Sequence, residues 1–184
     1  MNYYGPKELA ESFRTVRRNT IRIAEDIPEE KYGFRATPDT RTVGETLALI
    51  AVATRDAHRA HAVERIESYA GFDFAALGKR REEQAARLAT KDAILAALRE
   101  GGEEWAAYLE SVSEETLAQR LEFSPGIVPP SKSRFEMFLS VKEQEMHNRA
   151  QLMLIERMLG IVPHLTRERE ARLAELAKSR AAQP

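Results

Sequence analysis

Apolar residues recur at helical spacing along most of the chain, and the breaks in this spacing predict where helices end. From Leu9 to Ile27 the apolar positions fall on one stripe, which predicts a helix that begins near Pro6 and ends before Pro28. Residues 28–41 are rich in turn formers and read as a connector. No segment alternates apolar and polar residues with a period of two, so the pattern predicts no sheet.

The second predicted helix has a recognisable start. Thr42 and Glu45 fit a capping box, in which a cap side chain and the third helical side chain exchange hydrogen bonds with the backbone. The apolar spacing then continues to about Ser68. Residues 69–79 read as an irregular link, and we expect its two phenylalanines to pack in the core.

Two further long helices follow. A helix is predicted over residues 91–112, where Gly101 and Gly102 indicate either a bend or the close approach of another backbone. After a loop, a long helix spans about Ser133–Leu159, and Gly160 suits its C-terminal cap. Charged residues then predict a terminal helix.

Four long helices with short extra segments indicate an all-α, up-down four-helix bundle. We expect one domain over residues 1–165, with residues 166–184 as an extra charged helix packed on the bundle or on a partner chain. The chain has 184 residues, of which 43% are hydrophobic and 31% charged, as is typical of a folded domain. The net charge is −1 and basic residues alternate with acidic ones, so nothing indicates nucleic-acid binding.

The absence of cysteine excludes disulfides, thiolate metal ligands and a thiol nucleophile in this sequence. No run approaches the ~20 apolar residues of a membrane helix, so no membrane partner is expected. Residues 1–14 contain no apolar core of signal-peptide length. We therefore expect a cytoplasmic protein.

Three segments, in their order along the chain, resemble the DinB/YfiT-like family of bacterial four-helix-bundle proteins. They are residues 27–51, the GFDF sequence at 71–74 and residues 132–164. The resemblance implies a homodimer and a divalent metal, zinc or nickel, held by three histidines. It also implies a metal-dependent hydrolase or a thiol-dependent S-transferase.

The family's ligand positions correspond to Leu49 on the second helix and to Gln144 and Asn148 on the fourth. None of them is a histidine. Leucine offers no donor atom, and neutral amide oxygens are weak ligands for zinc and nickel. We therefore expect a lost metal site, no metal cofactor, and a remaining core pocket that binds a small molecule.

The helical spacing extends this pocket face and offers a second interpretation. A carboxylate between helices is a candidate general base, so Asp56 or Glu45 would serve a repurposed or redesigned metal-free enzyme. In the alternative, Asp56 only pairs with nearby arginines. The remaining wall positions are Ala53, Val141 and Gln151, with Trp105 and Tyr108 either lining the pocket or packing in the core.

The four histidines leave other ligand sets open. Glu143 and His147 lie four residues apart, although His147 is rotated about 100° from Asn148 and so should point away from the pocket. His58 and His61 lie three residues apart on the second helix, where a surface position is the simpler reading. His164 follows a helix cap and reads as a loop residue. Metal-independent acid/base chemistry is favoured over family metal chemistry if the chain is an enzyme.

Overall fold

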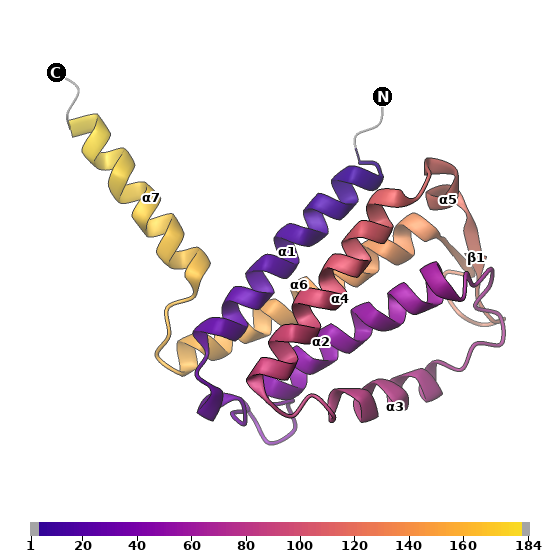
Figure 1. The fold of residues 1–184 in the computed structure, drawn as a ribbon, viewed down its shortest axis with the longest axis horizontal. Coiled ribbons are helices and arrows are strands. Elements are labelled where there is room, and N and C mark those ends of the chain that lie inside the picture. The colour runs from indigo at the N-terminus through magenta and orange to yellow at the C-terminus, as the bar shows by residue number, and fades with distance from the viewer. Residues whose placement is uncertain (1–3, 182–184) are drawn as a thin grey trace.

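A computed structural model describes residues 4–181 of the protein (Figure 1). Most of them are helical, and one short hairpin interrupts the helices. The helices are α1 (Pro6–Asp26), η1 (Glu29–Lys31), α2 (Val43–His58), η2 (Arg59–Val63), α3 (Phe74–Ala85), α4 (Lys91–Ser111), α5 (Glu114–Ala118), α6 (Arg134–Met158) and α7 (His164–Ala181), and the strands are β1 (Arg120–Glu122) and β2 (Ser131–Ser133).

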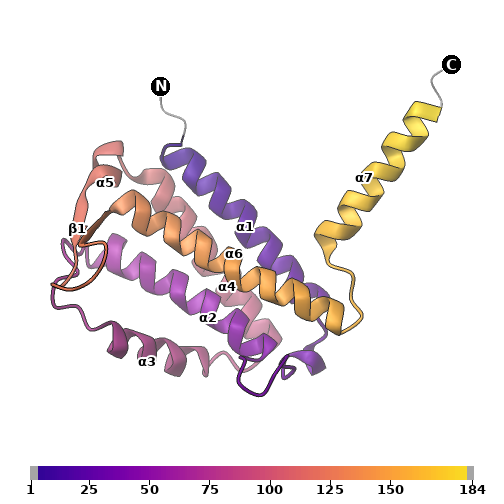
Figure 2. The same ribbon diagram turned by 180° about the vertical axis from the view of Figure 1, so that it is seen from behind.

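Helices α1, α2, α4 and α6 form the bundle. Helix α4 packs against both α1 and α2, and α6 packs against the same two helices. Figure 1 shows α4 between α1 and α2 on one face of the molecule, and Figure 2 shows α6 between them on the opposite face. The predicted all-α helix bundle with an extra C-terminal helix is confirmed.

Side-chain caps fix the starts of α2, α4 and α6. Thr42 Oγ1 accepts a hydrogen bond from the Glu45 main-chain nitrogen at 3.1 Å, and Glu45 Oε2 accepts one from the Thr42 main-chain nitrogen at 2.7 Å. The predicted capping box is therefore present. An equivalent box between Ser133 and Glu136 starts α6. Each cap contributes on the order of 1 kcal/mol to helix stability.

The second predicted helix ends earlier than expected. It is α-helical only to His58, after which η2 forms a wider π turn, and the expected continuation to Ser68 is wrong. Here the Ile66 main-chain nitrogen donates to the Ala60 carbonyl at 3.1 Å, and Arg65 adopts a positive φ of 51°. Apolar spacing cannot detect this end, because a π turn followed by a left-handed residue changes the backbone and not the hydrophobic pattern.

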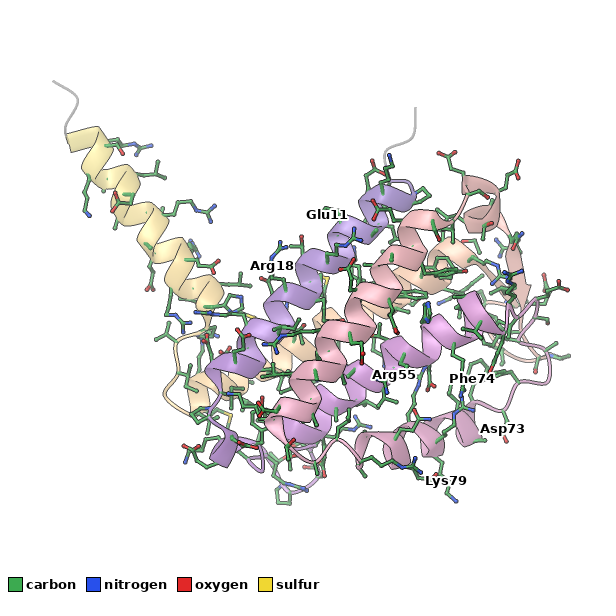
Figure 3. All side chains as sticks on the ribbon, in the orientation of Figure 1. Glu11, Arg18, Arg55, Asp73, Phe74 and Lys79 are labelled. Carbon is green, nitrogen blue, oxygen red and sulfur yellow. The ribbon has the colours of Figure 1, made fainter. Side chains whose placement is uncertain are left out.

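The expected irregular link contains a helix. Asp73 Oδ1 accepts a hydrogen bond from the Ala76 main-chain nitrogen at 2.9 Å and so caps α3, which begins at Phe74. The expectation that both phenylalanines pack in the core is also wrong. Phe74 is 42% exposed at the start of α3 (Figure 3), and the Phe72 and Phe74 rings contact Tyr69 instead. The two phenylalanine rings are thus partly covered by neighbouring aromatic rings at the surface, and not by the core of the bundle.

A two-stranded hairpin contradicts the expectation of no sheet. Strands β1 and β2 pair antiparallel, with Leu121 opposite Lys132. Each strand has only three residues, and only Leu121 in β1 is a buried apolar side chain, so no period-two pattern could form. The short helix α5 also lies outside the predicted elements.

Helix α7 projects away from the bundle, as Figures 1 and 2 show. Its base is held by an ion pair between Arg167 and Asp26 at 2.5 Å, and residues 167–180 are exposed. Packing along the bundle is therefore not observed, and packing on a partner chain stays a prediction. No helix among residues 4–181 has the length and apolar character needed to cross a membrane.

Candidate ligand cavity between α2, α3 and α6

A cavity of about 210 Å³ lies between α2, α3 and α6, and we call it the α2–α6 cavity. Positions three or four apart share a helix face, which is how residues spaced along α2 and α6 come together here. The lining residues are Arg41; Leu49, Ile50, Ala53 and Thr54 of α2; Gly78, Arg81 and Glu82 of α3; and Val141, Gln144, Glu145 and Asn148 of α6.

Gln144 and Asn148 bring amide groups to this cavity. Asn148 Nδ2 donates to the Gln144 main-chain carbonyl at 3.0 Å. Within residues 4–181, the Gln144 side chain and the Asn148 side-chain oxygen have no hydrogen-bond partner. These amide groups are therefore free to hydrogen-bond a ligand.

The inner wall of the cavity contains a buried ion pair. Arg17 Nε donates to Glu145 Oε1 at 2.9 Å, and Arg17 Nη2 donates to Glu145 Oε2 at 2.8 Å. Arg17 Nη2 also donates to Thr54 Oγ1 at 2.7 Å, and Nη1 donates to the Leu98 carbonyl at 2.7 Å. Arg17 and Glu145 are 4% and 2% exposed, so the pair is desolvated and its geometry is fixed by several charge-assisted hydrogen bonds.

This network divides the apolar core into two parts. One cluster surrounds Leu47 and Leu98, and the other surrounds Trp105 and Phe138. Each bundle helix contributes one residue to the layer around Arg17. Along the sequence of each helix, this residue separates the positions of one apolar cluster from those of the other. The four residues of this polar layer are Arg17 of α1, Thr54 of α2, Gly102 of α4 and Glu145 of α6.

Gly102 belongs to the layer because Arg17 lies against it. A Cβ atom at position 102 would be 2.8 Å from Arg17 Cγ and 3.0 Å from Arg17 Nη1, closer than such contacts allow. At Gly101, by contrast, a Cβ would meet nothing within 4 Å. Helix α4 runs through both glycines, so an arginine side chain, and not a backbone, makes the close approach at Gly102.

Asp56 does not line the α2–α6 cavity. It is 6% exposed, and Arg81 Nε donates to its Oδ2 at 3.0 Å. Arg80 and Arg59 lie 3.8 and 3.6 Å from its Oδ1. The expected place on the pocket face is not observed because the α3 arginines cover Asp56. Since Arg81 does line the cavity, Asp56 instead holds Arg81 in position.

Glu45 and Gln151 lie beside the cavity. The Glu45 carboxylate is occupied by the capping box, and it faces a neighbouring groove of about 640 Å³ that shares Arg41, Leu49 and Glu82 with the cavity. Gln151 Nε2 lies 2.9 Å from His147 Nε2 on the exposed side of α6.

The two aromatic wall candidates lie elsewhere. Trp105 is fully buried in the core, in edge-to-face contact with Phe138 at a centroid distance of 5.2 Å. Tyr108 lines a different pocket, near the hairpin. Of the two readings that the sequence left open for Trp105, core packing is the one observed.

The donor groups of the α2–α6 cavity do not suit zinc or nickel. Among the described residues that line it, the anionic side chains are Glu82 and Glu145, and Glu145 already pairs with Arg17. Within the described range 4–181, no three His, Cys, Asp or Glu side chains group closely enough to hold a metal ion. The His58 ring packs on Tyr108, whereas His61 is buried, so the surface position expected for both histidines is wrong for His61.

The helix-bundle fold agrees with a sequence comparison. The chain belongs to the DinB superfamily, whose family model matches residues 12–152. No curated protein matches the chain significantly in sequence.

Solved structures share the fold at low sequence identity. An uncharacterised protein from Clostridium difficile 630 superposes with a TM-score of 0.65 at 15% identity, covering 85% of this chain and 98% of that one. DfsB, described as a sibling lethal factor precursor, has a TM-score of 0.65 at 14% identity, over 88% and 100% of the two chains. The colibactin self-resistance protein ClbS, solved with a double-stranded DNA, has a TM-score of 0.62 at 15% identity, over 83% and 95%. At these identities the likeness establishes the fold alone.

Proposed function

We propose that the chain binds a small molecule in the α2–α6 cavity and does so without the metal ion of its family. One observation carries the proposal. Leu49, Gln144 and Asn148, the residues that the resemblance assigns to the three ligand positions, line one cavity although they come from two helices. Leucine has no donor atom, and amide oxygens bind zinc and nickel weakly. A cavity lined by these three side chains therefore suits an organic ligand better than a metal ion.

The lining suggests the chemistry of this ligand. Ile50, Ala53 and Val141 form an apolar wall, whereas Gln144 and Asn148 offer hydrogen-bonding amides. At about 210 Å³ the cavity is smaller than the roughly 300–1,000 Å³ of drug-sized sites. We propose a ligand of few heavy atoms, with an apolar body and one hydrogen-bonding group.

A metal-free enzyme is less well supported. A general base must reach the substrate, but Asp56 is held by arginines outside the cavity, and Glu45 caps α2. A metal-dependent hydrolase or thiol-dependent transferase would need a ligand set that the described residues do not group together.

Metal binding provides the first test. Protein purified without added metal is expected to contain no stoichiometric zinc or nickel by elemental analysis. A variant with Leu49→His, Gln144→His and Asn148→His is expected to bind about one ion per chain, because imidazoles on facing helices can share an ion. Equal uptake by both proteins would mean that the metal site lies elsewhere.

Ligand binding is tested with defined probes. Methyl NMR spectra are recorded while acetamide and 2-propanol are added, and the Leu49, Ala53 and Val141 methyl signals are expected to shift together. Ala53→Leu fills the cavity and should abolish the shifts, whereas Ala107→Leu, a matched change at an exposed position of α4, should not. Shifts that persist in Ala53→Leu would refute binding at this cavity.

A homodimer also remains a proposal. Met146, Leu154 and Met158 are 42%, 60% and 51% exposed and follow one another at helical spacing along α6. Such an apolar stripe suits contact with a second copy of the chain. Light scattering that gives a monomer mass at micromolar concentration would exclude the dimer.

A further inference from the structure

A second pocket opens at the hairpin end of the bundle, and we call it the hairpin pocket. Its volume is about 930 Å³, and it shares no lining residue with the α2–α6 cavity. This volume lies within the range of sites that hold metabolite-sized ligands. The residues that matter for its chemistry are His61, Arg65, Tyr108, Arg120 and Arg134.

Arg134 is a buried cation without an anionic partner. It is 6% exposed, and no carboxylate of residues 4–181 lies within 4.0 Å of its guanidinium. Two of its hydrogen-bond partners are neutral groups: Nε donates to Gln119 Oε1 at 2.8 Å and Nη2 donates to the Ile66 carbonyl at 2.6 Å. A buried charge that is hydrogen-bonded but not neutralised is unfavourable unless an anion joins it.

His61 does not neutralise Arg134. Arg134 Nη1 lies 3.0 Å from His61 Nδ1, and since a guanidinium can only donate, Nδ1 must be the acceptor. The proton of the neutral ring therefore sits on Nε2, which lies 3.3 Å from Tyr69 Oη. Burial first, and the charge of Arg134 second, lower the His61 pKa to about 4. At neutral pH this side chain orients Arg134 and carries no charge of its own.

Two more arginines face the same pocket. Arg120 Nε donates to Ser131 Oγ at 2.9 Å, which fixes the side chain but leaves its charge uncompensated. Arg65 is exposed, has no partner within the described residues, and is held at a positive φ of 51°. A non-glycine residue in this conformation is uncommon and is found preferentially at functional sites. Within the described part of the chain, Glu67 is the one acidic residue of the lining, so positive charge predominates.

The π turn η2 shapes this wall. Because the Ile66 main-chain nitrogen bonds to the Ala60 carbonyl, the His61 carbonyl stays outside the helical hydrogen bonds. Tyr108 Oη donates to that carbonyl at 3.0 Å, which ties α4 to the turn. π turns occur frequently at functional sites, and here the turn places His61 beside Arg134 and directs the chain to Arg65.

We infer that the hairpin pocket binds a small organic molecule through an oxyanion, a carboxylate or a phosphate group. Arg134 at the base and Arg120 and Arg65 at the rim supply the positive charge, and arginine forks match both oxyanions. A concave pocket with one buried arginine suits a compact ligand better than a nucleic-acid backbone, which needs a row of exposed cations. The inference does not depend on the α2–α6 cavity.

The single tryptophan reports on this pocket. The Trp105 ring lies 6.4 Å from the His61 ring and 5.6 Å from the Tyr108 ring, and both of these line the pocket. Fluorescence of the full chain is followed while inorganic phosphate, phenyl phosphate or benzoate replaces sodium chloride at constant ionic strength. A saturable change beyond the chloride baseline is expected, with phenyl phosphate or benzoate binding more tightly than inorganic phosphate.

Variants locate the binding site. Arg65→Gln and Arg120→Gln should each raise the dissociation constant of the tighter probe at least about 5-fold, because each removes one charged contact. Arg55→Gln is the matched control, since Arg55 is exposed on α2 and lines neither pocket (Figure 3). Arg134→Lys keeps the positive charge but loses the paired donors of the guanidinium, and is expected to weaken binding as well.

Three outcomes would overturn the inference. One is a response to every probe no larger than that to chloride. Another is equal binding by Arg55→Gln, Arg65→Gln and Arg120→Gln. The last is tight binding of a 12-base-pair DNA duplex that Arg65→Gln and Arg120→Gln weaken and that phenyl phosphate and benzoate do not displace, which would assign the arginines to nucleic acid.

Discussion

Two buried glutamates on helix α6 have opposite environments. Glu145 is 2% exposed and receives hydrogen bonds from Arg17 on both of its oxygens. Glu156 is 0% exposed, and neither of its oxygens has a hydrogen-bond partner within residues 4–181. Burial first, and the nearby Asp26 carboxylate second, raise the Glu156 pKa to about 7.

The difference shows two ways in which the interior of a helix bundle accommodates a carboxyl group. Where a guanidinium supplies several hydrogen bonds, the group forms an ion pair that also links neighbouring helices. Where none is present, desolvation favours the neutral acid. The first arrangement depends on its partner, and the second depends on pH.

The largest effect is expected when Glu145 is made to resemble Glu156. Arg17→Met leaves the Glu145 carboxylate buried without its partner and should lower the free energy of unfolding by about 3–5 kcal/mol. Urea titration measures this loss. The double variant Arg17→Met with Glu145→Leu removes both charges and should be more stable than Arg17→Met alone. Additive losses in the double variant would show that the two side chains are not energetically coupled.

A smaller effect is expected when the pair is displaced but not removed. Gly102→Ala places a methyl group against Arg17 and should destabilise the fold by about 1–3 kcal/mol. Gly101→Ala is the matched control, because its methyl group meets nothing and alanine favours the helix by about 1 kcal/mol. Thermal unfolding of the two variants should therefore move in opposite directions. A stabilised Gly102→Ala protein would mean that Arg17 readily finds another position.

The smallest effect concerns Glu156 and depends on pH. Its folded pKa of about 7 lies above the ordinary value of 4.5, so the folded state binds the proton more tightly and stability falls as pH rises through this window. Glu156→Gln removes the ionisation and should stabilise the protein by on the order of 1 kcal/mol at pH 8, with little gain at pH 5. Melting temperatures of both proteins across pH 5–8 measure the change. Parallel curves would show that Glu156 does not titrate there.

The sequence predicts the bundle because caps and apolar stripes are local signals. Thr42 and Glu45 form the capping box that their spacing indicates. Leu49, Gln144 and Asn148, which line one cavity, come from the family resemblance, since helical spacing relates only Gln144 to Asn148. What the sequence does not predict depends on contacts between distant segments. The pairing of Asp56 with arginines is one of the two alternatives that the sequence leaves open, but no helix is predicted over Phe74–Ala85, so Arg81 could not be identified as its partner.

The polar layer did leave a signal. Arg17 follows Phe13 by four residues on the apolar stripe of α1, and Glu145 holds the same relation to Val141 on α6. A charged residue within an apolar stripe is almost never fully buried unless paired, so two of opposite sign indicate an ion pair. The pairing itself, and the hairpin pocket with its left-handed Arg65, required the tertiary structure.

The wide turn at η2 also has a consequence for how sequence length can vary in this region. A π turn accommodates one more residue than an α turn between the same hydrogen-bonded ends. Removing a single residue within Arg59–Val63 would let the backbone close into ordinary α geometry, and the bundle helices would keep their places. Relatives that are one residue shorter here are thus expected to keep the helix bundle but to lose the hydrogen bond between Tyr108 and the His61 carbonyl. A one-residue gap in an alignment at this point would therefore mark chains without the same hairpin pocket.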